Sequence, residues 1–366
     1  MLLPKKNILC LFLLTVLALT TRAEAGLYGF SQTSRQSQIQ RSNALPRRIL
    51  NYRKEMRNLI TALSRYGKSR NPDFQILTHE GQYLLDKSLW EYHQENYNWI
   101  RNSNELVNDE SFLSRDVPEI EEEEKQPFID QYTEIIDGIV VNNHYCSNTP
   151  VDSQIKNKDI SLFSIEYCSN ENALDNAIAQ SFADNVAIYP FVHLDQAFRK
   201  IHNQLIINES ADSISKVAEA KNISFLINDE PFNSLYHMID DIRSSNYDII
   251  VINPIFQEKH PFTSEEINSL KFKKNGARRL VLALYNISEI SPSDYLWSKQ
   301  WNKKHPDWIV APSRVSENSY ITKYWTPEWR RLTGRYFKSI VDTGYDGVFF
   351  TGLENHNYFE HNTPLE

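Results

Sequence analysis

Along the chain, apolar residues recur either at helical spacing or in short continuous runs, from about residue 48 to the C-terminus. In the 48–68 segment, Ile49, Met56 and Leu63 share one face of a predicted helix. Further helices are predicted over 173–182, 233–244, 295–301 and 328–341, and after a hydroxyl cap at Thr263. Eight apolar segments are predicted to be strands: 74–77, 139–141, 162–166, 186–192, 224–227, 248–252, 279–285 and 348–350.

These strands predict an α/β fold. Segments such as 249–252 and 280–284 are almost wholly apolar, which is typical of parallel strands buried on both faces. Eight strands that alternate with helices favour a (β/α)8 TIM barrel, whose usual size is about 250 residues. An open doubly wound sheet is the alternative, but no glycine-rich phosphate loop accompanies the strands. We therefore expect one barrel domain over 47–366, with an insertion over 82–134 that contains an acidic run at 119–124.

The last helix–strand unit indicates where function should be sought. Pro327 begins its helix, Gly344 ends it, and the strand 348–350 follows. Polar residues come directly after this strand, among them Thr351 and Glu354. Active sites of barrel enzymes lie at the carboxyl ends of the strands. Asp346, at the opposite end of the strand, is expected to be a turn residue.

The N-terminal 25 residues have the pattern of a secretory signal peptide. Lys5 and Lys6 precede an apolar run over 8–19, and a small-x-small site ends at Ala25. The run is shorter than the roughly 20 residues that a membrane span needs. An uncleaved anchor is the alternative interpretation. We expect cleavage after Ala25, a flexible polar lead-in over 26–46, no membrane span afterwards, and a secreted or periplasmic protein.

The amino-acid composition restricts which ligands and cofactors the chain is expected to bind. With 39 basic and 47 acidic residues, the chain carries a formal charge of −8, which argues against nucleic acid as a ligand. Cys146 and Cys168 remain after cleavage, either as a disulfide or as two separate thiols. No Cys-x-x-Cys pattern occurs and the ten histidines are scattered, so neither a metal site nor a cofactor is predicted.

Several motifs resemble one family of glycoside hydrolases. The 280–283 segment followed by Glu289 resembles the third strand and Gly-Glu turn of the extracellular endo-α-1,4-polygalactosaminidase family, whose relatives were once labelled cysteinyl-tRNA-synthetase-like. The 324–329 segment (Tyr-Trp-Thr-Pro-Glu-Trp) resembles the family's Tyr-Trp-Asp-Pro-Glu-Trp. The 344–349 segment resembles its Gly-Phe-Asp-Gly-Val-Tyr, and 247–252 resembles its second strand. The resemblance implies a (β/α)8 barrel.

The N-terminal half resembles the same family in a different order. Segments at 52–74, 136–138, 165–167 and 186–189 resemble the family's fifth to eighth strands, which here precede the first four. The resemblance therefore implies a circular permutation of the barrel. The polar 201–222 segment would join the family's usual ends, at little cost because the termini of a domain lie close together at its surface.

The resemblance also implies a pair of catalytic carboxyls, one that protonates the leaving oxygen and one that acts as nucleophile or base. Glu289 and Glu354 are the expected pair, with Glu166 in a supporting role. Asn253, Thr351 and either Asn142 or Asn143 stand where the family has acidic residues, and Ser288 replaces a glycine. These amides and the hydroxyl of Thr351 would contact sugar. His79 and Glu80, directly after the first strand, are further candidate binding residues.

The predicted function is hydrolysis of an amino-sugar polysaccharide by a monomeric exported enzyme, with partly deacetylated, cationic sugar as substrate. Because amides and a hydroxyl stand where the family has acidic residues, a second interpretation stays open: a barrel that binds carbohydrate without cutting it. A third is an exported interaction protein that uses the 82–134 insertion.

Overall fold

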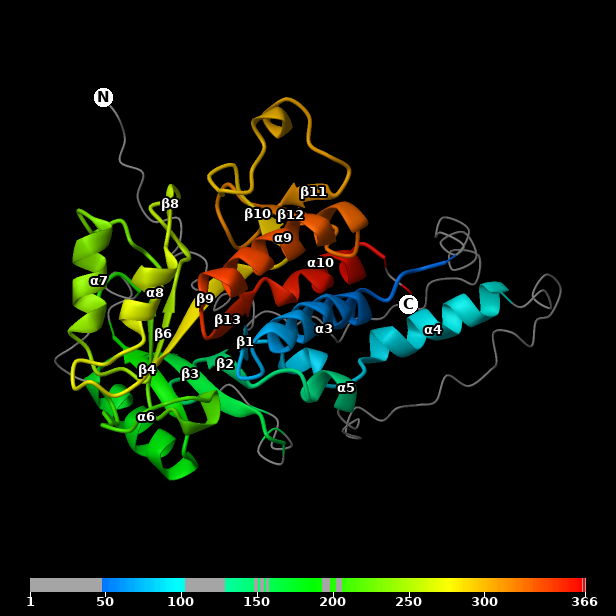
Figure 1. Cartoon of the computed structure of the whole chain (residues 1–366). Helices are drawn as coiled ribbons and strands as arrows, with labels where there is room; N and C mark the ends of the chain where they lie inside the picture. The colour runs from blue at the N-terminus through cyan, green and yellow to red at the C-terminus, as the bar shows by residue number, and fades with distance from the viewer. Residues whose placement is uncertain are drawn as a thin grey trace.

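The computed structural model describes residues 48–102, 129–147, 158–192, 198–201 and 206–363, together with residues 151, 155 and 365. The main strands span Gln75–His79 (β1), Gly138–Asn142 (β2), Ser161–Tyr167 (β3), Ala187–Phe191 (β4), Ile223–Leu226 (β5), Ile249–Ile252 (β6), Leu280–Asn286 (β9) and Gly347–Thr351 (β13). They form one eight-stranded sheet in the order β4-β3-β2-β1-β13-β9-β6-β5 (Figure 1). Every ladder in this sheet is parallel.

The sheet curves into a nearly closed barrel. The first strand, β1, pairs with the last, β13, and the two edge strands, β4 and β5, contact each other. Among the described residues β4 and β5 share no ladder; Phe198 bridges them, because its carbonyl accepts from the N–H groups of Ile227 and Asn228. The predicted (β/α)8 barrel is confirmed, and all eight predicted strands are present.

Helices surround the sheet, and their ends follow the sequence signals. They span Tyr52–Arg70 (α3), Leu89–Asn102 (α4), Asp130–Thr133 (α5), Glu171–Asp184 (α6), Leu235–Arg243 (α7), Ser264–Leu270 (α8), Pro327–Thr343 (α9) and His356–His361 (α10). Thr263 caps α8 in a capping box with Glu266, as predicted. Pro327 begins α9, and Gly344 ends it in the left-handed conformation. Helix α3 packs against α9 and α10 (Figure 1).

Strand residues alternate between two apolar layers. Leu280 and Leu282 of β9 point into the barrel with Phe349 of β13, whereas Val281 and Ala283 face the helices. This alternation follows from the period of two along a strand. By the same alternation, residues such as His79 and Thr351 reach the upper end of the barrel interior, at the carboxyl ends of the strands.

The lower end of the barrel is closed by the segment that links β4 to β5. Ile214 and Val217 belong to the inner core, and Val217, in a 3-10 turn at Val217–Glu219 (η6), donates its N–H to Gln75. Lys273 is fully buried and its ammonium group donates to the carbonyls of Ser210 and Asp212. Residues 206–222 of the predicted joining segment therefore contribute to the floor of the barrel.

Asp346 lies at the same end, where it was expected to be a turn residue. Its carboxylate accepts from the backbone N–H of Val281 and pairs with Lys271 at 3.0 Å and with Arg278 at 2.6 Å. The fold thus holds Asp346 on the face opposite the cavity described below.

Two smaller sheets and several 3-10 turns complete the fold. They comprise Ile255–Phe256 (β7), His260–Pro261 (β8), Glu289–Ile290 (β10), Ile309–Pro312 (β11), Tyr320–Thr322 (β12), Gln82–Leu84 (η1), Lys299–Asn302 (η7) and Leu353–Asn355 (η8). In Figure 1 the β10-β12-β11 sheet and its long connections lie above α9. None of the helices described in this structure is both long and apolar enough to cross a membrane.

One predicted helix is wrong. The 295–301 segment contains only the start of the short turn η7. Instead, Asp294 accepts the N–H of Ser291 through its side chain, and the indole of Trp297 donates to Asn302. Local side-chain bonds of this kind compete with helix formation. In the predicted 82–134 insertion, α4 is the main element; its acidic run at 119–124 lies outside the described residues, as do the predicted signal peptide and lead-in.

Candidate active site

A cavity of about 230 Å³ lies at the carboxyl ends of the strands, above β5, β6, β9 and β13. Its floor includes Phe349 and Thr351 of β13, and its walls include the loop after β9 and the aromatic residues Trp329 and Tyr336 of α9. The polar residues that line it are His79, Asn228, Asn253, Glu258, Tyr285, Asn286, Glu289, Ser291, Ser293, Asp294, Tyr295, Ser316, Ser319, Tyr336 and Thr351. Among the described residues, no lysine or arginine lines it.

The structure brings four of the predicted site residues to this cavity: Glu289, Asn253, Thr351 and His79. Glu354, Glu80, Asn142 and Glu166 do not line it. The cavity therefore takes its walls from several strand ends, as in barrel enzymes.

Glu289 is the best-anchored carboxylate of the cavity and is 4% exposed. Its Oε1 accepts hydrogen bonds from Ser313 at 2.7 Å and from Asn355 at 3.1 Å. Its Oε2 accepts from Ser316 at 3.1 Å and from Asn286 at 3.2 Å. Four donors from three separate loops thus fix the orientation of this side chain at the cavity wall.

The loops after β9 and β13 are locked together beneath Glu289. Ser288 donates to the carbonyl of Gly352 and accepts from the amide of Asn355 at 2.8 Å. Gly352 has φ = 81°, and a Cβ there would lie 2.3 Å from Oδ1 of Asn286. Only glycine fits this close approach. Ser288 is therefore part of the frame that positions Glu289.

Asp294 is a second carboxyl on the wall of the cavity, five residues after Glu289, and part of it reaches the surface. The residue as a whole is exposed, but partial desolvation of its carboxyl by the surrounding protein raises the pKa of Asp294 to about 6; the bond from Ser291 opposes this rise, while repulsion from Glu258 and Glu289 adds to it. A carboxyl with such a pKa can donate a proton near neutral pH.

Glu354 lies behind this pair, in the turn η8. Burial raises the pKa of Glu354 to about 7, and the negative charges of Glu289 and Glu80 contribute in the same direction. The structure thus places the predicted pair, Glu289 and Glu354, close enough to interact electrostatically, but Glu354 does not line the cavity. Its role as a catalytic acid stays a prediction.

Glu80 follows β1 with φ = 54°, a left-handed conformation that is rare outside glycine. Its carboxylate accepts from the N–H of Asn142 at 3.1 Å. Burial nevertheless raises the pKa of Glu80 to about 7, against the effect of hydrogen bonds from Asn142 and Gln82. A strained backbone and a perturbed carboxyl in one residue are features that gather at functional sites.

His79 and Asn142 form a neutral polar pair at the top of the barrel interior. The amide nitrogen of Asn142 lies 2.9 Å from Nε2 of His79. Burial lowers the pKa of His79 to about 4, against the effect of this hydrogen bond. His79 is therefore an uncharged group at neutral pH, and the cavity gains no positive charge from it.

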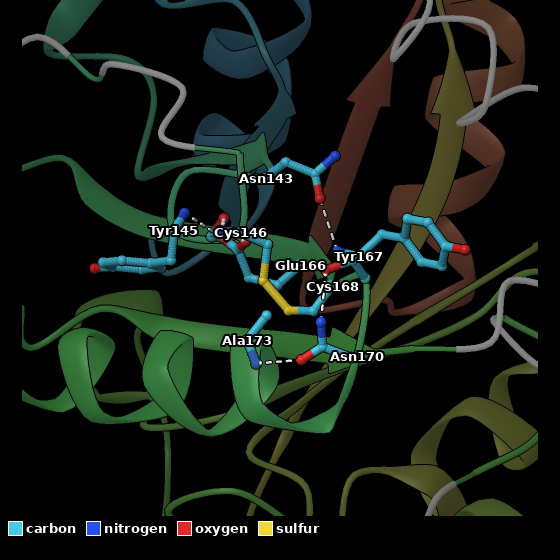
Figure 2. The surroundings of a disulfide bond; sticks show 10 residues. Asn143, Tyr145, Cys146, Glu166, Tyr167, Cys168, Asn170 and Ala173 are labelled. Atoms are coloured by element: carbon cyan, nitrogen blue, oxygen red, sulfur yellow. Dashed lines mark hydrogen bonds between the residues drawn. A yellow bond between two sulfur atoms is a disulfide. The ribbon is translucent and has the colours of Figure 1, made fainter.

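Glu166 has a different position, beside the disulfide between Cys146 and Cys168 (Figure 2). It is fully buried and accepts the N–H groups of Tyr145 at 3.1 Å and Cys146 at 2.9 Å. Ser164 donates to it as well. In this structure Glu166 holds the turn that carries Cys146, and a supporting role in catalysis stays a prediction.

Sequence reasoning missed several cavity residues. Asp294 and Glu258 were not singled out, although both come from loops that follow predicted strands. Glu258 is in the hairpin between β7 and β8, with φ = 60° and a left-handed neighbour, Gln257, at φ = 48°. Asp294 directly precedes the 295–301 segment, which was predicted to be a helix, and no motif marked it as a site residue. Ser313 and Ser316, which orient Glu289, lie in the loop between β11 and β12, whose sequence contains no recognisable motif.

Within the described residues, no group of three or more His, Cys, Asp or Glu side chains is arranged to hold a metal ion. No protein-family model matches the chain. The chain is 28% identical over 178 residues to an uncharacterized protein of Methanocaldococcus jannaschii, a match that covers 47% of this chain and 50% of that protein. An uncharacterized protein of Thermotoga maritima is 24% identical over 121 residues, 32% of this chain and 36% of its own. The chain therefore spans half or less of these curated relatives, and their names assign no activity.

Proposed function

We propose that the protein is an exported glycoside hydrolase that cleaves an amino-sugar polysaccharide. The observation that carries the proposal is the pair of carboxyls, Glu289 and Asp294, on the wall of one cavity at the carboxyl ends of the barrel strands. Their surroundings differ: Glu289 accepts four hydrogen bonds, and Asp294 has a pKa raised to about 6. Carboxyls with such different surroundings divide the roles of acid and base in glycoside hydrolysis.

In the proposed reaction, Asp294 donates its proton to the glycosidic oxygen as the bond from that oxygen to the anomeric carbon breaks. The fixed carboxylate of Glu289 faces the anomeric carbon and either forms a glycosyl ester or removes a proton from the attacking water. Water supplies the oxygen that ends on the anomeric carbon. In the first case water hydrolyses the ester and gives one proton to Asp294, which restores it; in the second case that proton passes to Glu289, and exchange with solvent then removes it from Glu289 and returns one to Asp294. Burial and the charge of Glu289 raise the pKa of Glu354 to about 7, so Glu354 would carry a proton close to Glu289 for much of the time at neutral pH.

The charge of the cavity supports an amino sugar as substrate. Glu258, Glu289 and Asp294 line it without a lysine or arginine among the described residues. A protonated amine would be attracted to these carboxylates, and amides such as Asn228 and Asn253 can hydrogen-bond sugar hydroxyls. The disulfide between Cys146 and Cys168 supports export, because disulfides persist in oxidising compartments.

The test is release of reducing ends from α-1,4-galactosaminoglycan by the purified protein. We expect the wild type to release them and Glu289→Gln to lose at least a hundredfold in rate. If Asp294 is the proton donor, Asp294→Asn should lose a comparable factor in rate, whereas Glu354→Gln should not. Glu230→Gln, an exposed carboxyl beyond β5, is the matched control and should keep full activity. No release by the wild type would contradict the hydrolase proposal for this polymer.

One observation favours a second function, binding without cleavage. The four protein donors on Glu289 occupy acceptor positions that a nucleophile or base would need. A non-catalytic carbohydrate-binding barrel would use Glu289 as a fixed hydrogen-bond partner for sugar. Calorimetric binding of galactosaminoglycan fragments without release of reducing ends, weakened by Glu289→Gln, would support this function over the first.

A further inference from the structure

A second hollow, of about 420 Å³, lies on the outside of the barrel between α9 and the loop that precedes β11. Its lining residues are Trp301, Trp308, Glu328, Arg331, Leu332 and Arg335. We call this hollow the Trp–Arg groove. In Figure 1 the loop that carries the two tryptophans lies above α9. The lining combines aromatic rings from one segment with guanidinium groups from another.

The lining of the Trp–Arg groove has two arginines and one glutamate, in a protein whose formal net charge is −8. Arg331 and Arg335 lie one turn apart on α9, and both are exposed. Arg331 approaches Glu328 at 3.7 Å with 73% of its side chain exposed, and Arg335 has no ion pair within the described part of the chain. Lys303 and Lys304, between the two tryptophans in sequence, are exposed and likewise unpaired there. These cations favour an anionic ligand.

The aromatic wall connects the groove to the cavity that holds Glu289. Trp308 lines the groove and is 7% exposed, so its ring is rigidly held. Its ring centroid lies 5.0 Å from that of Trp301 and 5.2 Å from that of Trp329. Trp329 in turn lines the cavity and donates its indole N–H to Ile287. The two indoles of Trp308 and Trp329, tilted by 48° to each other, therefore lie between the two hollows.

We infer that the Trp–Arg groove binds a carboxylated pyranose, a uronate unit, of the polysaccharide whose amino-sugar linkage enters the cavity. The inference rests on the proposed function for the identity of the polymer. The apolar face of a pyranose can pack against the accessible part of the half-buried indole of Trp301, and a carboxylate fits the forked donors of Arg331 and Arg335. An aromatic ring beside the two guanidinium groups favours a carboxylated sugar over an acidic peptide, which needs the cations alone. The substrate would then carry both amino and carboxylate sugars.

The experiment measures calorimetric binding of tetragalacturonate to the purified wild type at low salt. We expect binding that weakens at least tenfold in the Arg331→Gln/Arg335→Gln variant and in 0.5 M NaCl, but not in Glu289→Gln. Arg243→Gln, an exposed arginine at the end of α7, is the matched control and should bind as the wild type does. Trp301→Phe should retain binding better than Trp301→Ala, because phenylalanine keeps an aromatic face.

Unchanged binding in the double arginine variant would overturn the inference. So would equally tight binding of hexaglutamate, which would identify an acidic peptide as the ligand, or of a neutral galacto-oligosaccharide. The outcome is separable from that of the proposed function. Tetragalacturonate binding that depends on the arginines, together with no cleavage of galactosaminoglycan, would support the groove and contradict the hydrolase. Cleavage of galactosaminoglycan without tetragalacturonate binding would support the hydrolase and contradict the groove.

Discussion

Replacing Glu354 by glutamine should stabilise the protein at pH 8 and leave its stability almost unchanged at pH 4. The folded protein raises the pKa of Glu354 from 4.5 to about 7, first through burial and then through the charges of Glu289 and Glu80. Below pH 4.5 both folded and unfolded chains keep the proton, so the group has no effect. Between pH 4.5 and 7 the unfolded chain loses its proton first, and the folded state loses stability as the pH rises.

At 1.36 kcal/mol for each pKa unit, the difference between 4.5 and about 7 corresponds to about 3 kcal/mol. Glutamine has no proton to lose, so the Glu354→Gln variant should avoid this cost. The free energy of unfolding of the variant, relative to wild type, should therefore rise by about 2–3 kcal/mol between pH 4 and pH 8. The effect on Glu80 has the same sign, because removing a negative neighbour eases its ionisation.

The assay is urea-induced unfolding followed by tryptophan fluorescence at pH 4, 6 and 8, for wild type, Glu354→Gln and the exposed control Glu230→Gln. The control should follow the wild type at each pH. The reasoning is refuted if the difference in unfolding free energy between Glu354→Gln and wild type is the same at pH 4 and pH 8. In that case Glu354 would ionise in the folded protein as it does in the unfolded chain.

Three further predictions concern other parts of the chain. Lys273→Met should lower the free energy of unfolding by about 3–5 kcal/mol in a urea titration, because it leaves the fully buried Asp248 without its partner; adding Asp248→Asn should recover part of the loss, and no recovery would contradict this explanation. Cys146→Ser/Cys168→Ser should cost about 3 kcal/mol for a closed loop of 22 residues, and reductant should destabilise the wild type but not this variant. If Asp294 is the proton donor, the rate of hydrolysis should fall as the pH rises through about 6, and a pH–rate profile of Asp294→Asn should lack that limb.

The barrel could be predicted from sequence because the signals that define its strands and helices lie within a few neighbouring residues. Each strand is a short apolar run such as Ile249–Ile252, and helices α3, α6, α7 and α8 each begin at a side-chain cap, such as Thr263, that acts within four residues. The failure at 295–301 is local too. There, apolar spacing suggested a helix, but Asp294 bonds back to Ser291 and turns the chain. Spacing alone does not reveal which side chains bond to their own backbone.

The candidate site could be predicted only in part, because its contacts are distant in sequence. Glu289 could be found, since it follows a buried strand. Its donors could not, because Ser313, Ser316 and Asn355 come from two other loops, as far as 66 residues away. The position of Glu166 depends on the turn that carries Cys146, which no pattern in the sequence describes.

Carboxyls at the lower end of the barrel are paired with cations, whereas several at the upper end are not. This difference supports the upper end as the location of the functional site. At the lower end, Asp248 and Asp346 are each paired directly with a lysine, so their charges stabilise the fold. At the upper end, burial raises the pKa values of Glu80, Asp294 and Glu354, and no lysine or arginine acts on any of them to oppose it. An ionised carboxyl held this way costs stability at neutral pH. A chain that pairs its acids at one end could do so at the other. Carboxyls without a cationic partner at the upper end, with Asp294 on the cavity wall, are what proton transfer to a bound ligand requires.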